Sequence, residues 1–116
     1  MNADLKTLIV HFYQNINGKS PVRDWLLSIE RKDCRIIGED IKTIEFGWPV
    51  GLPVCKNLGR GLYESRSNLT DKKIARVIFC IVESKMILLH GFIKKSQQTP
   101  KSEIDLAIKR KKEVLQ

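Results

Sequence analysis

The sequence has few cysteines, no long apolar run and no sign of a secretory leader. Its three cysteines, Cys34, Cys55 and Cys80, are widely spaced and include no C-x-x-C pair, so we expect no disulfide framework and a cytoplasmic location. A zinc site would have to recruit from Cys55, Cys80, His11 and His90, and none of these residues stands at ligand spacing. No segment approaches the ~20 apolar residues of a membrane span, and the first residues lack a small-residue cleavage site. We therefore expect no metal, no cofactor and no membrane contact.

The familiar signatures of nucleotide and metal chemistry are also missing. The chain has no GxGxxG, GxxxxGK[ST] or HExxH motif, which argues against the usual dinucleotide, phosphate-loop and zinc-protease sites. Two histidines give no basis for a Ser/His/Asp triad. Any catalytic chemistry must therefore come from charged and polar side chains outside these motifs.

Positive charge is in excess, and it is unevenly distributed. The 116 residues hold 21 Lys and Arg against 13 Asp and Glu, a formal net charge of +8. Residues 1–50 contain seven basic and seven acidic side chains, whereas residues 51–116 contain fourteen and six, so the second half carries the whole excess. This distribution favours a polyanionic partner, and nucleic acid is the first candidate. A basic surface that is simply solvated is an equal alternative.

Length and composition fit a single domain over residues 1–116, since 42% of the residues are hydrophobic and 29% are charged. A β-branched and aromatic run predicts a first strand over Leu5–Tyr13. Ser20 and Pro21 then predict a helix start, and apolar residues at helical spacing over 22–29 predict one buried helical face.

A second helix is expected from about Asp33 to Gly47, and the Gly/Pro-rich stretch 48–61 is expected to be a long loop. The buried face of that helix should contain Cys34, Ile37, Ile41 and Ile44. Three strands follow, joined by short turns, and the middle one is apolar on both faces and so should be central. Their predicted ranges are Leu62–Ser67, Ile74–Val82 and Met86–Ile93.

Thr99 and Pro100 predict the cap and first turn of a terminal helix with a basic outer side over 109–112. The predicted order is therefore β-α-α-β-β-β-α. This order indicates an α+β fold in which an N-terminal strand, a helical hairpin and a C-terminal helix accompany one antiparallel sheet.

Charged side chains are expected to gather at one end of this sheet. By the two-residue period of strands, Glu64 and Arg66 share a face, and Arg76 leads the apolar face of the central strand. Convergence of Arg66, Arg76 and Lys94 would form a phosphate site, because guanidinium pairs bidentately with phosphate and ammonium acts as a point charge. Taken singly, these residues also fit structural roles: edge-protecting charges, a Glu64 ion pair, and His90 as a packed, hydrogen-bonded core histidine.

Several segments carry a resemblance to a known family. They are GLYESR at 61–66, ARVIF at 75–79 and LLHGFIKKSQQTP at 88–100, followed by EIxxAxxR at 103–110. Together they resemble the HigB-type branch of the RelE/ParE toxin superfamily over essentially the whole chain, and FIKKSQQTP is the most specific piece. The resemblance implies a RelE-like fold, whose element order agrees with the one expected from the residues.

The resemblance also implies a function. It points to the toxin of a bacterial type II toxin–antitoxin pair that enters the ribosomal A site, cuts mRNA there and is neutralised by an antitoxin, often a HigA-like one with a helix-turn-helix domain. By motif position, Arg76 and Arg66 would hold the scissile phosphate. Lys94 or Lys95 would donate to the leaving oxygen or neutralise its charge. Glu64 is the candidate base for the 2′-hydroxyl, with a lysine of lowered pKa as the competing choice.

The basic second half would then approach rRNA phosphates through a sequence-independent attraction. Two other functions stay open: a ParE-like gyrase poison, and a non-catalytic nucleic-acid-binding module that binds without cutting. The candidate RNA contacts are Lys56, Lys72, Lys73, Lys109, Arg110 and Lys112.

Overall fold

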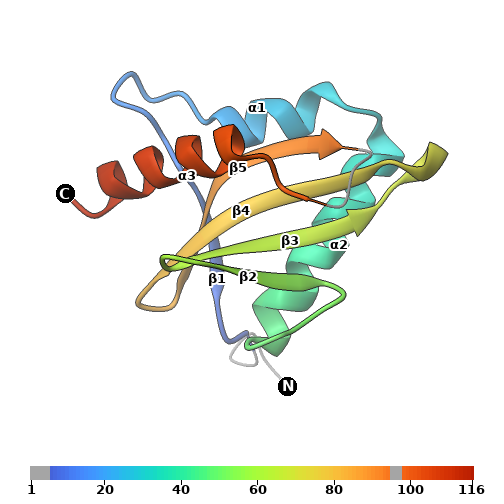
Figure 1. Cartoon of the computed structure of the whole chain (residues 1–116), viewed down its shortest axis with the longest axis horizontal. Coiled ribbons are helices and arrows are strands. Elements are labelled where there is room, and N and C mark those ends of the chain that lie inside the picture. The colour runs from blue at the N-terminus through green and yellow to red at the C-terminus, as the bar shows by residue number, and fades with distance from the viewer. Residues whose placement is uncertain (1–5, 95–97) are drawn as a thin grey trace.

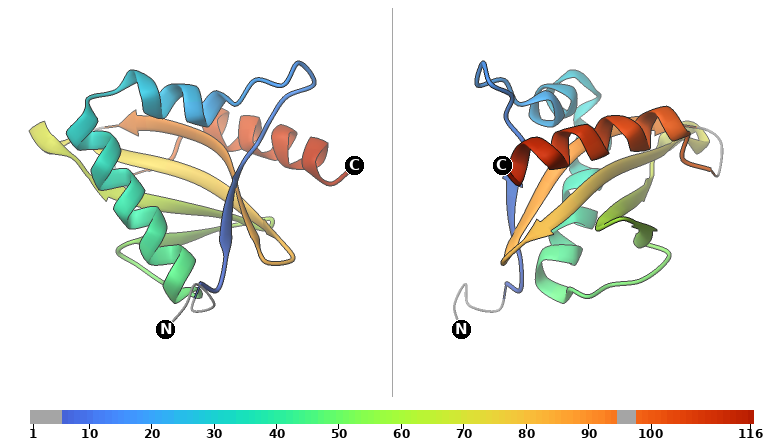
Figure 2. Two further views of the ribbon diagram at one scale, coloured as in Figure 1. Left: turned by 180° about the vertical axis from the view of Figure 1, so that it is seen from behind. Right: turned by 60° about the vertical axis from the view of Figure 1, so that its left-hand side comes forward.

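A five-stranded sheet runs through the centre of the molecule, with helices packed on both faces (Figure 1). The computed structural model describes residues 6–94 and 98–116. Helices α1 and α2 cover one face and α3 covers the other, which gives the described chain three layers (Figure 2). The elements are β1 Ile9–Phe12, α1 Pro21–Ser28, α2 Arg31–Gly47, β2 Cys55–Gly59, β3 Leu62–Asn68, η2 Thr70–Lys72, β4 Ile74–Val82, β5 Lys85–Lys94 and α3 Lys101–Val114.

The strand order is β1-β5-β4-β3-β2, and the sheet is mixed. Strands β2 to β5 form an antiparallel meander that contains the three strands predicted after residue 61. Strand β1, however, pairs with β5 in parallel, so the prediction of a wholly antiparallel sheet was wrong at its first strand. A parallel neighbour cannot be reached through a tight hairpin, and here the chain passes through α1, α2 and the rest of the meander before β5 returns beside β1.

Strand β2 lies inside the stretch that was predicted to be a loop. It pairs with β3 from Cys55 opposite Ser65 to Gly59 opposite Leu62. The strand is short and mostly exposed, and it follows a Gly/Pro-rich segment, so it lacks the apolar alternation by which strands are predicted. The observed order is therefore β-α-α-β-β-β-β-α, an α+β arrangement compatible with a RelE-like fold.

Apolar cores lie on both sides of the sheet, and β4 contributes to both, as predicted for the central strand. Val77 and Phe79 belong to the core beneath α1 and α2. Ile78 and Cys80 belong to the core beneath α3. Alternate residues of β4 are thus buried on opposite faces, which is why this strand reads as a continuous apolar run.

Helix α2 begins at Arg31, slightly before its predicted start, and buries the predicted isoleucines. Its buried stripe begins at Asp33, which leaves Cys34 at the margin, only half-buried, contrary to the prediction. The buried Asp33 carboxylate accepts a hydrogen bond from Thr70 Oγ1 at 3.3 Å and lies 3.6 Å from Lys73 Nζ. These two contacts anchor the helix to the β3–β4 connection.

A β-bulge in β5 reverses the alternation of that strand. The register shifts between Ile78 and Phe79 of β4, which leaves Leu89 as an extra residue in β5. Leu88 lies in the core beneath α1 and α2, whereas Phe92 lies in the core beneath α3, although an unbroken two-residue period would put both on one face. Because of the bulge, Phe92 faces α3 and not the core beneath α1 and α2.

Substitution of Gly91 tests the packing of α1 on β5, and Gly38 provides the comparison. A Cβ atom at Gly91 would overlap the ring of Trp25, which packs directly on the strand backbone. We expect Gly91→Ala to lower the free energy of unfolding by ~1–3 kcal/mol through overpacking. Gly38 in α2 has open space at the same atom, so Gly38→Ala should raise it by ~0.5–1 kcal/mol. Urea unfolding measures both, and an unchanged midpoint for Gly91→Ala would contradict this packing.

Candidate functional site

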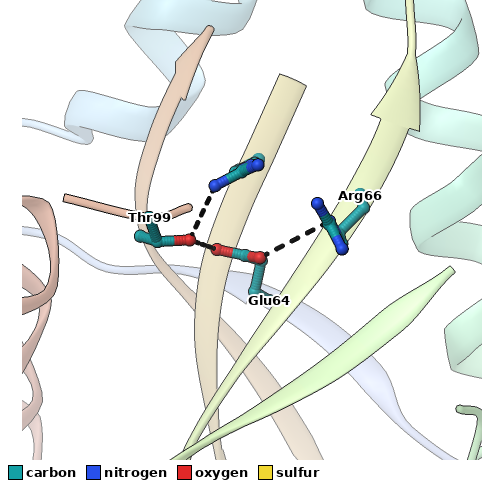
Figure 3. A network of polar contacts seen from close by, with 4 residues as sticks. Glu64, Arg66 and Thr99 are labelled. Atoms are coloured by element: carbon teal, nitrogen blue, oxygen red, sulfur yellow. Dashed lines mark hydrogen bonds and ion pairs between the residues drawn. The ribbon is translucent and has the colours of Figure 1, made fainter. Parts of the chain in front are cut away.

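A buried carboxylate joins two arginines and a threonine at one end of the sheet (Figure 3). Arg76 Nη1 donates a hydrogen bond to Thr99 Oγ1 at 2.9 Å. That hydroxyl donates in turn to Glu64 Oε2. The other carboxylate oxygen, Oε1, lies 3.7 Å from Arg66 Nε. Three of the predicted site residues, Glu64, Arg66 and Arg76, are thus brought together. We call these three residues and Thr99 the Glu64 network.

The strand register determines this meeting. Arg66 of β3 and Arg76 of β4 are directly opposite each other in the ladder, and like charges at such positions repel. Glu64 precedes Arg66 by one strand period and so shares its face. The carboxylate therefore places a negative charge where the register would otherwise bring two cations together.

Two members of the network are closed to solvent, and the other two, Arg66 and Thr99, are partly exposed. Arg76 is 0% and Glu64 1% exposed, whereas the Arg66 side chain is 18% exposed. Burial lowers the pKa of the Arg76 guanidinium from its ordinary value; the Glu64 carboxylate raises it, and Arg66 lowers it further. An arginine nevertheless stays protonated at neutral pH, so the network holds two cations around one carboxylate.

A shallow hollow opens beside Arg66. Its volume is about 190 Å³, and its lining consists of Pro53, Arg66, Asn68 and Ile74. Lys94 is half-buried and pairs with Ile74 across the β4–β5 ladder, so the two residues share a face of the sheet. Lys95, the other predicted lysine, lies outside the described residues. An anion in this hollow would meet Arg66 directly and Arg76 only through the network.

Thr99 is the member of the network that the sequence prediction missed. The prediction assigned Thr99 and Pro100 to a helix cap and first turn, but α3 begins at Lys101 with Pro100 at the N-cap. Thr99 is one residue too early to cap, and its hydroxyl contacts Arg76 and Glu64 instead. The available signal was its place at the end of FIKKSQQTP, the most specific part of the resemblance.

His90 is packed and hydrogen-bonded, as predicted, but it is half-buried and belongs to neither core. Its Nε2 lies 2.9 Å from Glu103 Oε1, and its ring stacks on Phe92 with the centroids 5.4 Å apart. Because Glu103 stands in the first turn of α3, this contact fastens the start of that helix to β5. It therefore helps to hold the segment that carries Thr99.

The predicted RNA contacts differ in what surrounds them. Lys73 pairs with the buried Asp33 at 3.6 Å. Arg110 donates from Nη1 to the carbonyl oxygen of Leu89 at 2.8 Å and lies 5.3 Å from the centroid of the Tyr13 ring. Both side chains thus have contacts that stabilise the fold. The remaining candidates are exposed: Lys56, Lys72, Lys109 and Lys112.

Metal clusters and membrane spans are both absent from the described residues. Over 6–94 and 98–116, no three His, Cys, Asp or Glu side chains gather as potential metal ligands. In the same part of the chain, no helix combines the length and the apolar character needed to cross a membrane.

One family model matches the sequence, that of the phage derived protein Gp49-like family (DUF891), over residues 24–112. No curated protein gives a significant match. The matched range contains α2, the whole β2–β5 meander and all four members of the Glu64 network. It covers 89 of the 116 residues, counting from 24 to 112. The chain therefore belongs to the Gp49-like family of phage-derived proteins, a family associated with toxin–antitoxin toxins of the RelE/HigB type.

Proposed function

We propose that this chain is the toxin of a toxin–antitoxin pair and that it cleaves mRNA on the ribosome as an endoribonuclease. Membership of the Gp49-like family supports the toxin assignment. The observation that carries the cleavage is the pair of cross-strand arginines at a buried carboxylate, which pairs with Arg66 beside a surface hollow and is linked to Arg76 through Thr99. Fixed cations at such a hollow suit a phosphodiester, whose negative charge increases in the transition state.

The proposed reaction uses the nucleophile that RNA itself carries. The 2′-oxygen forms a bond to the adjacent phosphorus, and the bond from phosphorus to the 5′-oxygen of the next nucleotide breaks. The 2′-hydroxyl loses a proton and the leaving oxygen gains one, so the products are a 2′,3′-cyclic phosphate and a 5′-hydroxyl. The protein has to hold the reacting atoms in line and stabilise the added charge.

The two arginines have different roles in this proposal. Arg66 contacts the scissile phosphate, because it is the arginine that lines the hollow. Arg76 is fully buried and acts through the network as a positioning residue. Glu64 is also buried, and Thr99 and Arg66 both engage its carboxylate. This environment favours a role in orienting the guanidinium groups over the role of base, so the proton of the 2′-hydroxyl passes to the competing candidate, a neutral lysine.

Proton transfer to the leaving oxygen falls to a lysine. Lys94 shares a sheet face with Ile74, a residue of the hollow, and its ammonium group donates the proton or neutralises the developing charge. Lys95 remains the second candidate for this task. The partners in the proposal are mRNA, the ribosome and a cognate antitoxin of the helix-turn-helix, HigA-like type.

Primer extension on one mRNA, with and without translating ribosomes, tests the function. Codon-phased cuts that need ribosomes would support the proposal. Cuts in both reactions would mean a free ribonuclease and would remove the ribosome from it. Intact mRNA in both reactions, from folded protein, would contradict cleavage and leave a binding module or a gyrase poison.

Arg66 gives the sharpest substitution. We expect Arg66→Ala to reduce the cleavage rate by ~100-fold, because it removes a donor to the transition-state charge. Arg35→Ala is the matched control, since Arg35 is exposed on α2, across the sheet from the hollow. Arg76→Ala is a weaker test, because truncating a fully buried arginine removes the donor to Thr99 and a positive charge near the buried Glu64 carboxylate, and so lowers stability. Full activity of Arg66→Ala would rule out its contact with phosphate.

Lys109 and Lys112, two exposed lysines of α3, are proposed contacts to rRNA phosphates. We expect Lys109→Glu with Lys112→Glu to weaken ribosome binding and to reduce the slope of log affinity against log salt by about one for each lysine–phosphate pair removed. Lys32→Glu with Lys42→Glu changes the net charge equally but on α2, where both lysines are exposed. Sedimentation with ribosomes at several salt concentrations measures the slopes. Equal slopes for the two double variants would mean that total charge matters and that α3 makes no specific contact.

A further inference from the structure

Thr99 is the residue of the Glu64 network to which neither the sequence pattern nor the family match gives a role in the reaction. We infer that Thr99 is a positioning residue of the proposed ribonuclease. Its hydroxyl accepts a hydrogen bond from Arg76 at 2.9 Å and donates one to Glu64. The inference rests on the proposed function and adds to it a group that acts through the arginines without touching RNA.

The chemistry of the three groups leaves the direction of both hydrogen bonds without an alternative. A guanidinium can only donate, an ionised carboxylate can only accept, and a hydroxyl can do each once at the same time. Thr99 therefore matches a buried donor to a buried acceptor, both of which would cost free energy if left without partners. A valine at this position has the same shape but can do neither.

The hydroxyl also determines what the second carboxylate oxygen does. With Oε2 of Glu64 engaged by Thr99, Oε1 faces Arg66 at 3.7 Å. The terminal torsion of a glutamate side chain is soft, so without the Thr99 hydrogen bond the carboxylate would turn away from this arrangement. Arg66, the arginine at the hollow, would then no longer be held in a fixed direction.

The backbone holds Thr99 where this role requires it. Proline at position 100 has a restricted φ, and the N–H of Glu103 donates to the Pro100 carbonyl at 3.1 Å. Glu103 also binds His90 of β5 at 2.9 Å. Thr99 itself is β-branched, which restricts its own χ1 rotation. The hydroxyl is therefore presented by a fixed segment and not by a freely moving side chain.

Three threonine variants test this role in ribosome-dependent cleavage. We expect Thr99→Val to lower kcat by ~10–100-fold with little change in KM, because misplaced groups cost rate more than binding. Thr99→Ser keeps the hydroxyl and should restore most of the rate. Thr70→Val is the matched control, since Thr70 likewise donates to a buried carboxylate, that of Asp33, but on the α2 side. It should cleave like the wild type.

Two results would overturn the inference. The first is full kcat in Thr99→Val. The second is an equal loss of kcat in Thr99→Val and Thr99→Ser together with a lowered unfolding midpoint in both, because that pattern marks a purely structural residue. NMR of the Arg76 guanidinium protons distinguishes failure of the Thr99 inference from failure of the proposed function. If the wild type leaves mRNA intact, the ribonuclease proposal fails, and the spectra alone decide about Thr99. Protected protons that disappear in Thr99→Val and persist in Thr99→Ser support the bridge; identical spectra refute it.

Discussion

The carboxylate of Glu64 is the group on which this end of the molecule depends. It is 1% exposed, and removing such a charge from water costs several kcal/mol unless nearby partners compensate. The antiparallel register sets Arg66 and Arg76 opposite each other, so the carboxylate also offsets their repulsion. The two arginines thus offset the cost of burying the carboxylate, and the carboxylate offsets their mutual repulsion. The same contacts that stabilise this end of the sheet also set the geometry of the site.

The rest of the fold supports this arrangement from two sides. Helices α1 and α2 build one core and carry no member of the Glu64 network, which leaves the opposite face for the charged residues. On that face, α3 is attached through Glu103 to His90 and through Arg110 to the carbonyl of Leu89. The segment before α3 contributes Thr99. Packing and site chemistry are therefore divided between the two faces of one sheet.

Those parts of the fold and of the site that depend on local periodicity in the sequence could be predicted. Apolar periodicity located both hairpin helices and strands β3 to β5, and strand alternation placed Glu64, Arg66 and Arg76 on the faces that they occupy. Other features depend on long-range partners. No local sequence pattern indicates the parallel pairing of β1 or the short, exposed strand β2. The bulge at Leu89 is defined only by the pairing of β5 with β4. Thr99 was assigned to a cap because capping and tertiary contacts use the same hydroxyl.

A single exposed arginine would be a poor anchor for a reacting phosphate, because its long side chain would lose considerable conformational freedom on binding. Here Arg66 is held by a carboxylate that is itself held by Thr99, with Arg76 buried behind. The cost of ordering these groups is met when the chain folds, not when substrate binds. Preorganised charge of this kind stabilises a transition state without rearranging during the reaction. The buried arginine therefore contributes to the proposed chemistry by keeping the exposed one in place.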